Sequence, residues 1–138
     1  MHVNRELDCE SPEYDKIGRK PHIKLGSSSW HQGGKWHKEW RCSVDWFKSR
    51  GFMQGGEGGN VIFHSGGSYQ RAYSLALRWA KKLGLPFIKS GGAGAILVWV
   101  PDKKLTPEQR GLLFQLLTVK GEKEFKKIKA RISSERLP

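Results

Sequence analysis

Residues 39–48 read EWRCSVDWFK, and their side chains alternate in character along the chain. Trp40, Cys42, Val44 and Trp46 would lie on one side of an extended chain, with mixed side chains on the other. Strict alternation of this kind is typical of a half-buried β-strand. The stretch therefore predicts a central strand whose apolar side contacts the core.

Two further parts of the chain are expected to be extended. Residues 22–30 form a first candidate, weakened by Gly26 and three serines, and the pair Gly33-Gly34 then breaks the chain. Residues 60–64 (NVIFH) contain β-branched and aromatic side chains that favour a short strand.

A hairpin is expected later in the chain. Residues 87–89 and 95–100 are apolar and flank the glycine-rich turn 91–94. Two short apolar runs on either side of such a turn are typical of paired antiparallel strands.

Two helices have clear start signals. Ser68 can cap a helix whose apolar stripe runs to Gly84, a residue suited to a left-handed C-terminal cap. Thr106 and Gln109 form a capping box at the start of a leucine-rich helix. Residues 122–132 can continue as a lysine-rich helix.

These elements predict one α+β domain, with an antiparallel sheet of about four strands and two main helices packed on one face. We expect three regions along the chain. Residues 1–20 are interpreted as a flexible acidic or mixed leader, residues 21–120 as the folded domain, and residues 121–138 as a basic helix or tail.

The charge of the 138-residue chain indicates a polyanionic partner. Lys and Arg number 25 against 13 Asp and Glu, so the net charge is +12, and the leader contributes −1 of it. A folded, strongly basic domain with six Trp points first to nucleic acid. No run reaches the roughly 18 apolar residues of a membrane helix, so no membrane partner is expected. Two cysteines, Cys9 and Cys42, indicate a reduced, intracellular protein of the cytoplasm.

Residues suited to catalysis are few. Glu39 and Asp45 are the only candidate carboxylate pair, and six residues of strand separate them by roughly 20 Å. The glycine-rich stretches lack the Lys-Ser/Thr or helix context of phosphate-binding loops. His31 and His37 have no close Cys partner and are interpreted as loop residues. We therefore expect a protein that is not an enzyme, with no metal or other cofactor.

The strongest binding signal is residues 35–41, where cations alternate with large aromatic rings. Trp36 follows two glycines and a lysine, which is a poor place for a core residue, whereas Trp40 shares its strand side with core candidates. Trp46, Trp79 and Trp99 are assigned to the core. Lys and Arg hold phosphates, and Trp rings stack on bases. The candidate nucleic-acid-binding residues are Lys35, Trp36, Lys38, Trp40, Arg41, Lys48, Arg50, Arg71, Arg78, Lys89 and Ser90, with Ser65 and Ser68 as further hydroxyl groups.

The segment WHKEWR (36–41) resembles the Trp…Glu-Trp-Arg signature of the tombusvirus and aureusvirus RNA-silencing suppressors. The later order of elements is also similar, over about residues 30–119. The resemblance implies a viral protein of the host cytoplasm that binds double-stranded RNA as a homodimer on a concave sheet. It also implies that Trp36 and Trp40 stack on duplex ends from an N-terminal helical bracket.

This chain departs from that pattern in two ways. Its two Trp are four residues apart rather than three, and its leader is short for a helical bracket. The short leader fits better with the aureusvirus-like members, which bind duplex RNA without strict size selection. A spacing of four puts both rings on one side of either a helix or a strand. Charge alone leaves a single-strand binder, a small nuclease and a protein-interaction module as alternatives.

Overall fold

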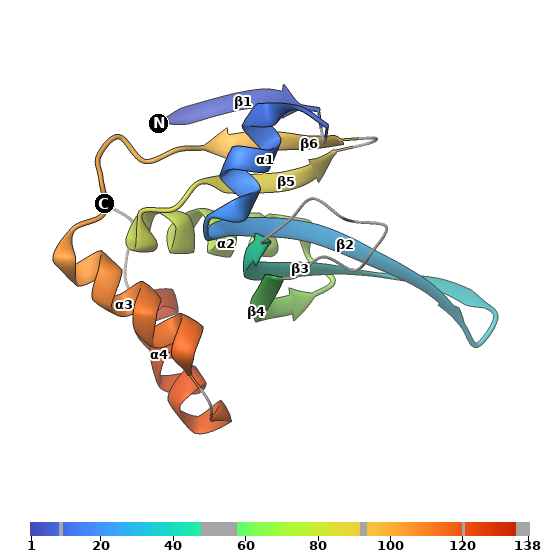
Figure 1. Ribbon diagram of the computed structural model, residues 1–138. Helices are drawn as coiled ribbons and strands as arrows, with labels where there is room; N and C mark the ends of the chain where they lie inside the picture. The colour runs from blue at the N-terminus through green and yellow to red at the C-terminus, as the bar shows by residue number, and fades with distance from the viewer. Residues whose placement is uncertain (9, 48–57, 92–93, 120, 135–138) are drawn as a thin grey trace.

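The computed structural model describes residues 1–8, 10–47, 58–91, 94–119 and 121–134. In these residues the chain forms six strands and four helices (Figure 1). In chain order they are β1 (His2–Leu7), α1 (Pro12–Arg19), β2 (His22–Gln32), β3 (Lys35–Phe47), β4 (Gly58–Gly66), α2 (Tyr69–Leu83), β5 (Phe87–Gly91), β6 (Gly94–Trp99), α3 (Pro107–Thr118) and α4 (Glu122–Ser134).

The strands form one mixed sheet in the order β1-β6-β5-β2-β3-β4. The α+β class is confirmed, but the expectation of about four antiparallel strands is wrong. β2 and β5 are parallel, whereas the other neighbouring pairs are antiparallel. The parallel pair arises because α2 carries the chain back from β4 to β5, and a helical crossover returns the next strand in the same direction.

The leader is a folded part of the sheet, and not the flexible arm that its composition suggests. β1 pairs with β6, with Leu7 opposite Ala95. The hydroxyl of Ser11 caps α1, and Arg5 on β1 donates to Glu13 on α1 at 2.7 Å. Composition missed this region because its few apolar side chains are spread over a strand and a helix. They meet only in the folded chain, where Val3, Leu7, Tyr14 and Ile17 pack with Ile88, Ala95 and Leu97.

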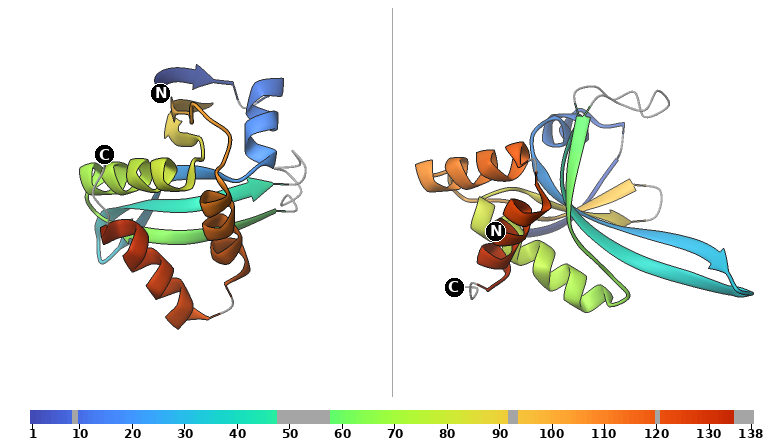
Figure 2. Two further views of the ribbon diagram at one scale, coloured as in Figure 1. Left: turned by 90° about the vertical axis from the view of Figure 1, so that its left-hand side faces the viewer. Right: turned by 90° about the horizontal axis from the view of Figure 1, so that it is seen from below.

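The main core lies between the other side of the sheet and the helices α2, α3 and α4. Its centre is the stacked pair of Phe63 and Trp79, whose ring centroids are 3.8 Å apart. Trp79 is fully buried, as predicted, whereas Trp46 and Trp99 are half-buried. The two main helices, α2 and α3, contribute to this one core, and Figure 2 shows a further helix, α1, on the other side of the sheet from α2 and α4.

The predicted helix caps are confirmed. Thr106 and Gln109 form the reciprocal capping box of α3. Gly84 ends α2 with a φ of 68°, and a Cβ there would lie 2.8 Å from Leu105. Residues 122–134 form α4, which confirms the helical option for this basic segment up to Ser134. Among the described residues, no helix is both long enough and apolar enough to cross a membrane.

Candidate nucleic-acid interface

The glycine pair between β2 and β3 is a tight turn and not a break. Gly33 and Gly34 have φ angles of 61° and 75°, the left-handed values of a two-residue hairpin turn. Such a turn fixes the register, so Gln32 lies opposite Lys35 and the ladder continues down to His22 opposite Asp45. The result is one long hairpin that contains most of the candidate residues.

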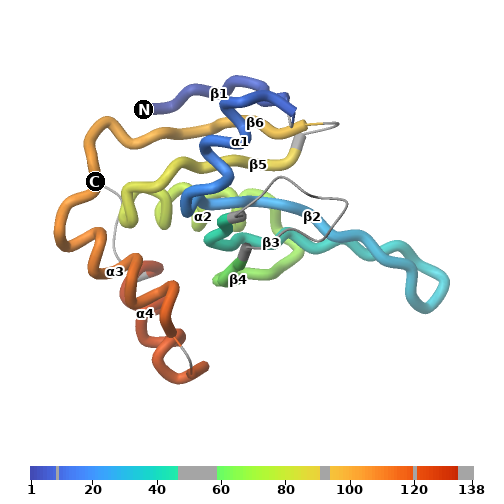
Figure 3. Tube along the Cα trace, in the orientation of Figure 1, coloured from blue at the N-terminus to red at the C-terminus, as the bar shows by residue number. Residues whose placement is uncertain are grey.

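The outer half of this hairpin has no neighbouring strand among the described residues. β5 pairs with β2 only from Ile23 to Leu25, and the pairing of β4 with β3 begins at Trp40. Residues 28–39, called the arm below, therefore form a two-stranded ribbon. The arm projects from the body of the molecule in the ribbon views and in the Cα trace (Figures 1, 2 and 3).

Each face of the arm carries one Trp, one His and one Lys. Cross-strand partners point to the same side, so Trp36 shares a face with His31, and Trp30 shares the opposite face with His37. The Trp36 face also carries Lys38 and is continuous with the main-core side of the sheet. The Trp30 face carries Lys35. His31 and His37 are thus strand residues and not loop residues.

The rings of the arm are exposed. Trp36 is 76% exposed and meets the imidazole of His31 edge to face at a centroid distance of 5.3 Å. Trp30 is 39% exposed and lies nearly parallel to His37, at 5.5 Å and 19°. A ring nitrogen of His37 is 3.2 Å from the carbonyl oxygen of Gln32. Neither Trp is part of a core cluster.

A cluster of cations and rings lies where the arm joins the body. The ammonium of Lys38 is 4.5 Å from the centre of the Trp40 ring, which packs edge to face on Tyr69 at 4.7 Å. Lys89 donates to the Tyr69 hydroxyl at 3.1 Å and lies within 6 Å of the rings of Tyr69 and Tyr73. Trp40 also packs on the main core. Its ring is therefore half-buried, unlike that of Trp36, which is largely exposed.

The opposite side of β2, β3 and β4, called the open face below, carries polar residues around Arg41, together with the exposed Ile62 opposite Ser43. Arg41 lies there, 50% exposed, opposite Ser65 on β4 and Gly26 on β2. The register places Ser90 next to Gly26, and a Cβ on that glycine would be 3.6 Å from the Ser90 hydroxyl. Arg41 and Ser90 therefore share a face that Trp40 and Lys89 do not.

The two acidic candidates on β3 are engaged with cations. Glu39 lies 3.4 Å from Arg41, and Asp45 lies 3.9 Å from the ammonium of Lys24 and accepts from Ser43. Each of these two carboxylates therefore has a cation beside it that offsets its negative charge.

Arg78 has a structural role. It is half-buried, and its guanidinium donates to the carbonyl oxygen of Ser133 in the last turn of α4. The indole N–H of Trp79, the next residue on α2, donates to the hydroxyl oxygen of Ser133 at 3.4 Å. A cation at helical carbonyls stabilises a helix end, so Arg78 fastens α4 to α2. This contact gives the Arg78 side chain a structural role that requires no nucleic acid.

Arg71 is exposed in the first turn of α2, the helix whose first residue, Tyr69, packs on Trp40. Its backbone amide donates to the Ser68 hydroxyl. Burial, and then the charges of Arg71 and Lys129, lower the pKa of His64 below its usual range. Lys48 and Arg50 lie outside the described residues, so their predicted role is carried forward only as a prediction.

The structure thus divides the predicted site residues into three groups. Trp36, Lys38, Trp40 and Lys89 share the main-core side of the sheet, Lys35, Arg41 and Ser90 share the opposite side, and Arg71 and Arg78 lie on α2. The sequence-based selection missed Trp30, His31, His37, Tyr69 and Tyr73. The Gly33-Gly34 pair could have identified the first three, because a two-residue turn sets every cross-strand partner.

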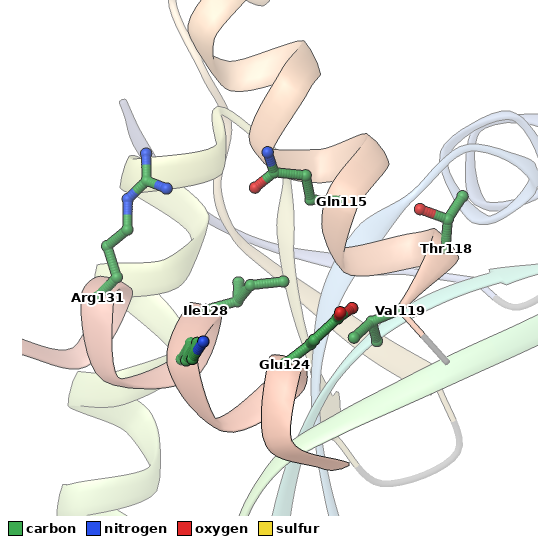
Figure 4. Close-up of a pocket in the computed structure, with 7 residues that line it drawn as sticks. Gln115, Thr118, Val119, Glu124, Ile128 and Arg131 are labelled. Carbon is green, nitrogen blue, oxygen red and sulfur yellow. The ribbon is translucent and has the colours of Figure 1, made fainter. Parts of the chain in front are cut away.

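Other parts of the described chain offer little chemistry. Burial raises the pKa of the Cys42 thiol to about 12, and its sulfur donates to the Ala72 carbonyl at 3.2 Å. No group of three metal-binding side chains occurs in the described residues. A hollow of about 410 Å³ separates α3 from α4, with Gln115, Glu124 and Arg131 among its lining residues (Figure 4). A second hollow, of about 500 Å³, is lined mainly by apolar residues near Ile17 and Leu85.

Comparison with known proteins identifies no relative of this chain. No protein-family model matches the chain, and no curated protein or solved structure is detectably similar to it. The interface is therefore defined by its geometry and charge.

Proposed function

We propose that this protein is a non-catalytic nucleic-acid-binding protein whose preferred ligand is double-stranded RNA, bound by shape and phosphate contacts. The observation that carries the proposal is Trp36, which is 76% exposed on a projecting arm between Lys35 and Lys38. Binding would sequester short RNA duplexes, as the resemblance to viral silencing suppressors implies.

The exposure of Trp36 needs a partner to explain it. A large ring left in water gains nothing from folding, because it removes almost no apolar surface from solvent. The same ring stacked on a base contributes roughly 1–3 kcal/mol to binding. Lys38 on the same face and Lys35 on the other, in a chain with a net charge of +12, attract the phosphates that accompany any base.

The preference for duplex RNA is supported by the open face. A-form RNA is recognised mainly through phosphates and 2′-hydroxyls across its shallow minor groove. The open face offers the guanidinium of Arg41 and the hydroxyls of Ser65 and Ser90, which can contact both groups. A homodimer, also implied by the resemblance, would double this surface.

The two Trp residues that correspond to the Trp pair of the suppressors occupy a different kind of element in this proposal. Trp36 and Trp40 lie on strand β3 and not on a helical bracket, and Trp40 packs against Lys38 and Tyr69. Trp36 is therefore the main stacking ring, and Trp40 supports the base of the arm. A chain without such a bracket would bind duplexes without strict length selection.

A mobility-shift assay with RNA duplexes of graded length tests the proposal. Single-stranded RNA and duplex DNA of the same lengths are compared at one salt concentration, with Mg²⁺ present to reveal cleavage. We expect the duplex RNA to be shifted intact, and Trp36→Ala to weaken binding by about 1–3 kcal/mol. The matched control is Phe114→Ala, which removes a ring that is 68% exposed on α3.

Each alternative has its own outcome in that assay. A preference for single strands would replace duplex recognition by base stacking along one strand. Cleavage of the RNA would indicate a nuclease. An absence of binding to any nucleic acid would end the proposal.

A further inference from the structure

A short repeat surrounds the hairpin turn: the dipeptide Trp-His occurs at Trp30-His31 and again at Trp36-His37, in the stretch WHQGGKWH. Adjacent residues of a strand point to opposite sides, so each dipeptide places its Trp on one face and its His on the other. The two-residue turn then sets Trp30 opposite His37 and His31 opposite Trp36. Each face of the arm therefore receives one complete Trp-His pair.

Each pair has a lysine beside it. Lys35 is two residues from His37 on β3, and Lys38 is two residues from Trp36 on the same strand, so each lysine shares a face with its pair. Both faces thus combine a ring, an imidazole and an ammonium. This is the set that binds a base by stacking and its phosphate by charge.

Cross-strand packing alone is a weak reason for two such pairs. A pair of rings on an exposed ribbon contributes roughly 0.2–1 kcal/mol, and aliphatic or Thr side chains would supply a similar amount. An arm that used only its Trp36 face would need no exposed ring on the other side. Yet Trp30 is 39% exposed, and among the described residues the only aromatic ring that it contacts is that of His37.

The contact between Trp30 and His37 leaves Trp30 ready to stack. The two rings are nearly parallel, at an interplanar angle of 19°. The hydrogen bond between His37 and the carbonyl of Gln32 fixes the imidazole and therefore the orientation of the ring that lies against it. A base that stacked on Trp30 would extend an existing stack rather than order a free side chain.

We propose that the Trp30–His37 face is a second nucleobase-stacking site, so that the arm lies between two nucleotides instead of resting on one surface. The inference rests on the proposed function and adds to it the second site and the way in which the arm enters the ligand. Because bases would flank both faces of the arm, it would insert between separated bases and would not lie along a groove, which presents only base edges.

The test combines binding with a fluorescent base. RNA that contains 2-aminopurine is titrated with the wild-type protein, Trp30→Ala, Trp36→Ala and the double variant. Stacking on an indole quenches this base. We expect each single variant to bind roughly tenfold more weakly and to keep part of the quenching, and the double variant to lose the remainder. Trp30→Phe, which retains a ring, should stay close to wild type.

The outcomes separate the two proposals. If the wild-type protein binds no RNA, the proposed function fails. If Trp36→Ala weakens binding but Trp30→Ala does not, the proposed function stands and the second site does not exist. If Trp36→Ala alone abolishes all quenching, Trp30 only supports the arm, and the inference is overturned.

Discussion

The β2–β3 hairpin has two halves, the arm and the remainder of the two strands, called the base. They share one uninterrupted register, but they differ in their neighbouring strands and in the burial of their side chains. In the base, Ile23 and Leu25 on β2 lie opposite Val44 and Cys42 on β3, and all four are buried. In the arm, residues 28–39 carry rings, imidazoles and lysines that are largely exposed. The backbone register is continuous, so the two halves differ in their neighbouring strands and in their side chains.

This difference shows which side chains serve the fold and which are free to serve a ligand. Large rings in the base would be explained by burial alone. The same rings in the arm have no core to enter, and an isolated two-stranded ribbon is only marginally stable in water. The arm is therefore held in place by the base, and its exposed aromatic content supports the proposal of a partner outside the chain.

The largest expected effect is a difference between the two halves in how far a substitution lowers the free energy of unfolding. Leu25→Ala in the base removes a side chain that is 1% exposed and should lower the free energy of unfolding by about 2–5 kcal/mol. Trp36→Ala in the arm should change it by less than about 0.5 kcal/mol. Urea or guanidinium denaturation measures both. Equal losses would show that the arm is part of the cooperative core.

A second effect tests whether the shape of the arm matters for binding. Gly34→Val places a β-branched residue at a φ of 75°, where strain costs about 1–2 kcal/mol, while a Cβ there has open space. We expect weaker RNA binding, with the free energy of unfolding lowered by no more than this strain of about 1–2 kcal/mol. Gly34→Asn, which tolerates this conformation better, is the matched control. If both variants bind like the wild type, the turn does not position the rings.

A smaller effect concerns the charges around the base. Arg41→Ala should weaken binding to all duplex sequences alike and reduce the log–log salt slope by about 0.9 if Arg41 neutralises one phosphate. With about six phosphates contacted, the wild-type slope should be near −5, using the rule for B-form DNA. Affinities measured over a range of salt concentrations give both values. Arg110→Ala, at an exposed position on α3, serves as the control, and an unchanged slope for Arg41→Ala would remove Arg41 from the interface.

The smallest effect is a dependence of stability on pH that belongs to the base. Burial lowers the pKa of His22 below its usual range, although its hydrogen bond to the Lys20 carbonyl opposes the shift. The folded protein therefore binds the proton less well than the unfolded chain, so stability is complete above about pH 6.5 and falls as the pH drops through the folded pKa. Unfolding measured between pH 7 and pH 5 should show this decline.

The matching variant assigns that decline to one half of the hairpin. His22→Gln should make the decline shallower, and His64, whose pKa is also lowered, accounts for part of what remains. A profile that is unchanged by His22→Gln would contradict the assignment.

Local signals in the sequence were sufficient for several elements. Alternation identified the base half of β3, and the caps at Ser68, Gly84 and Thr106 located two helices, because each depends on residues only a few positions apart. The leader could not be predicted in this way. Its strand β1 is stabilised by β6, about ninety residues later, and no local pattern contains that pairing.

The site was predicted in part for the same reason. Trp36 was recognised because its glycine neighbours exclude it from the core, and its exposure confirms that argument. Arg78 was selected for its charge alone, and its contact with Ser133 in α4 depends on tertiary structure. Trp30 was passed over because the glycine pair was interpreted as a break, which concealed the pairing between Trp30 and His37.

The pairing of β1 with β6 also determines when the leader can fold. During synthesis at roughly 5–20 residues per second, residues 2–7 wait roughly 5–20 s before residues 94–99 exist to pair with them. The hairpin of β2 and β3 needs only its own turn and can close within microseconds. Because a strand without its partner has open backbone groups, the nascent chain is exposed to mispairing at β1 for most of its synthesis. We therefore expect β1 and α1 to dock after the β2–β3 hairpin has formed, and pulse-labelled hydrogen exchange during refolding would show them gaining protection later than the hairpin.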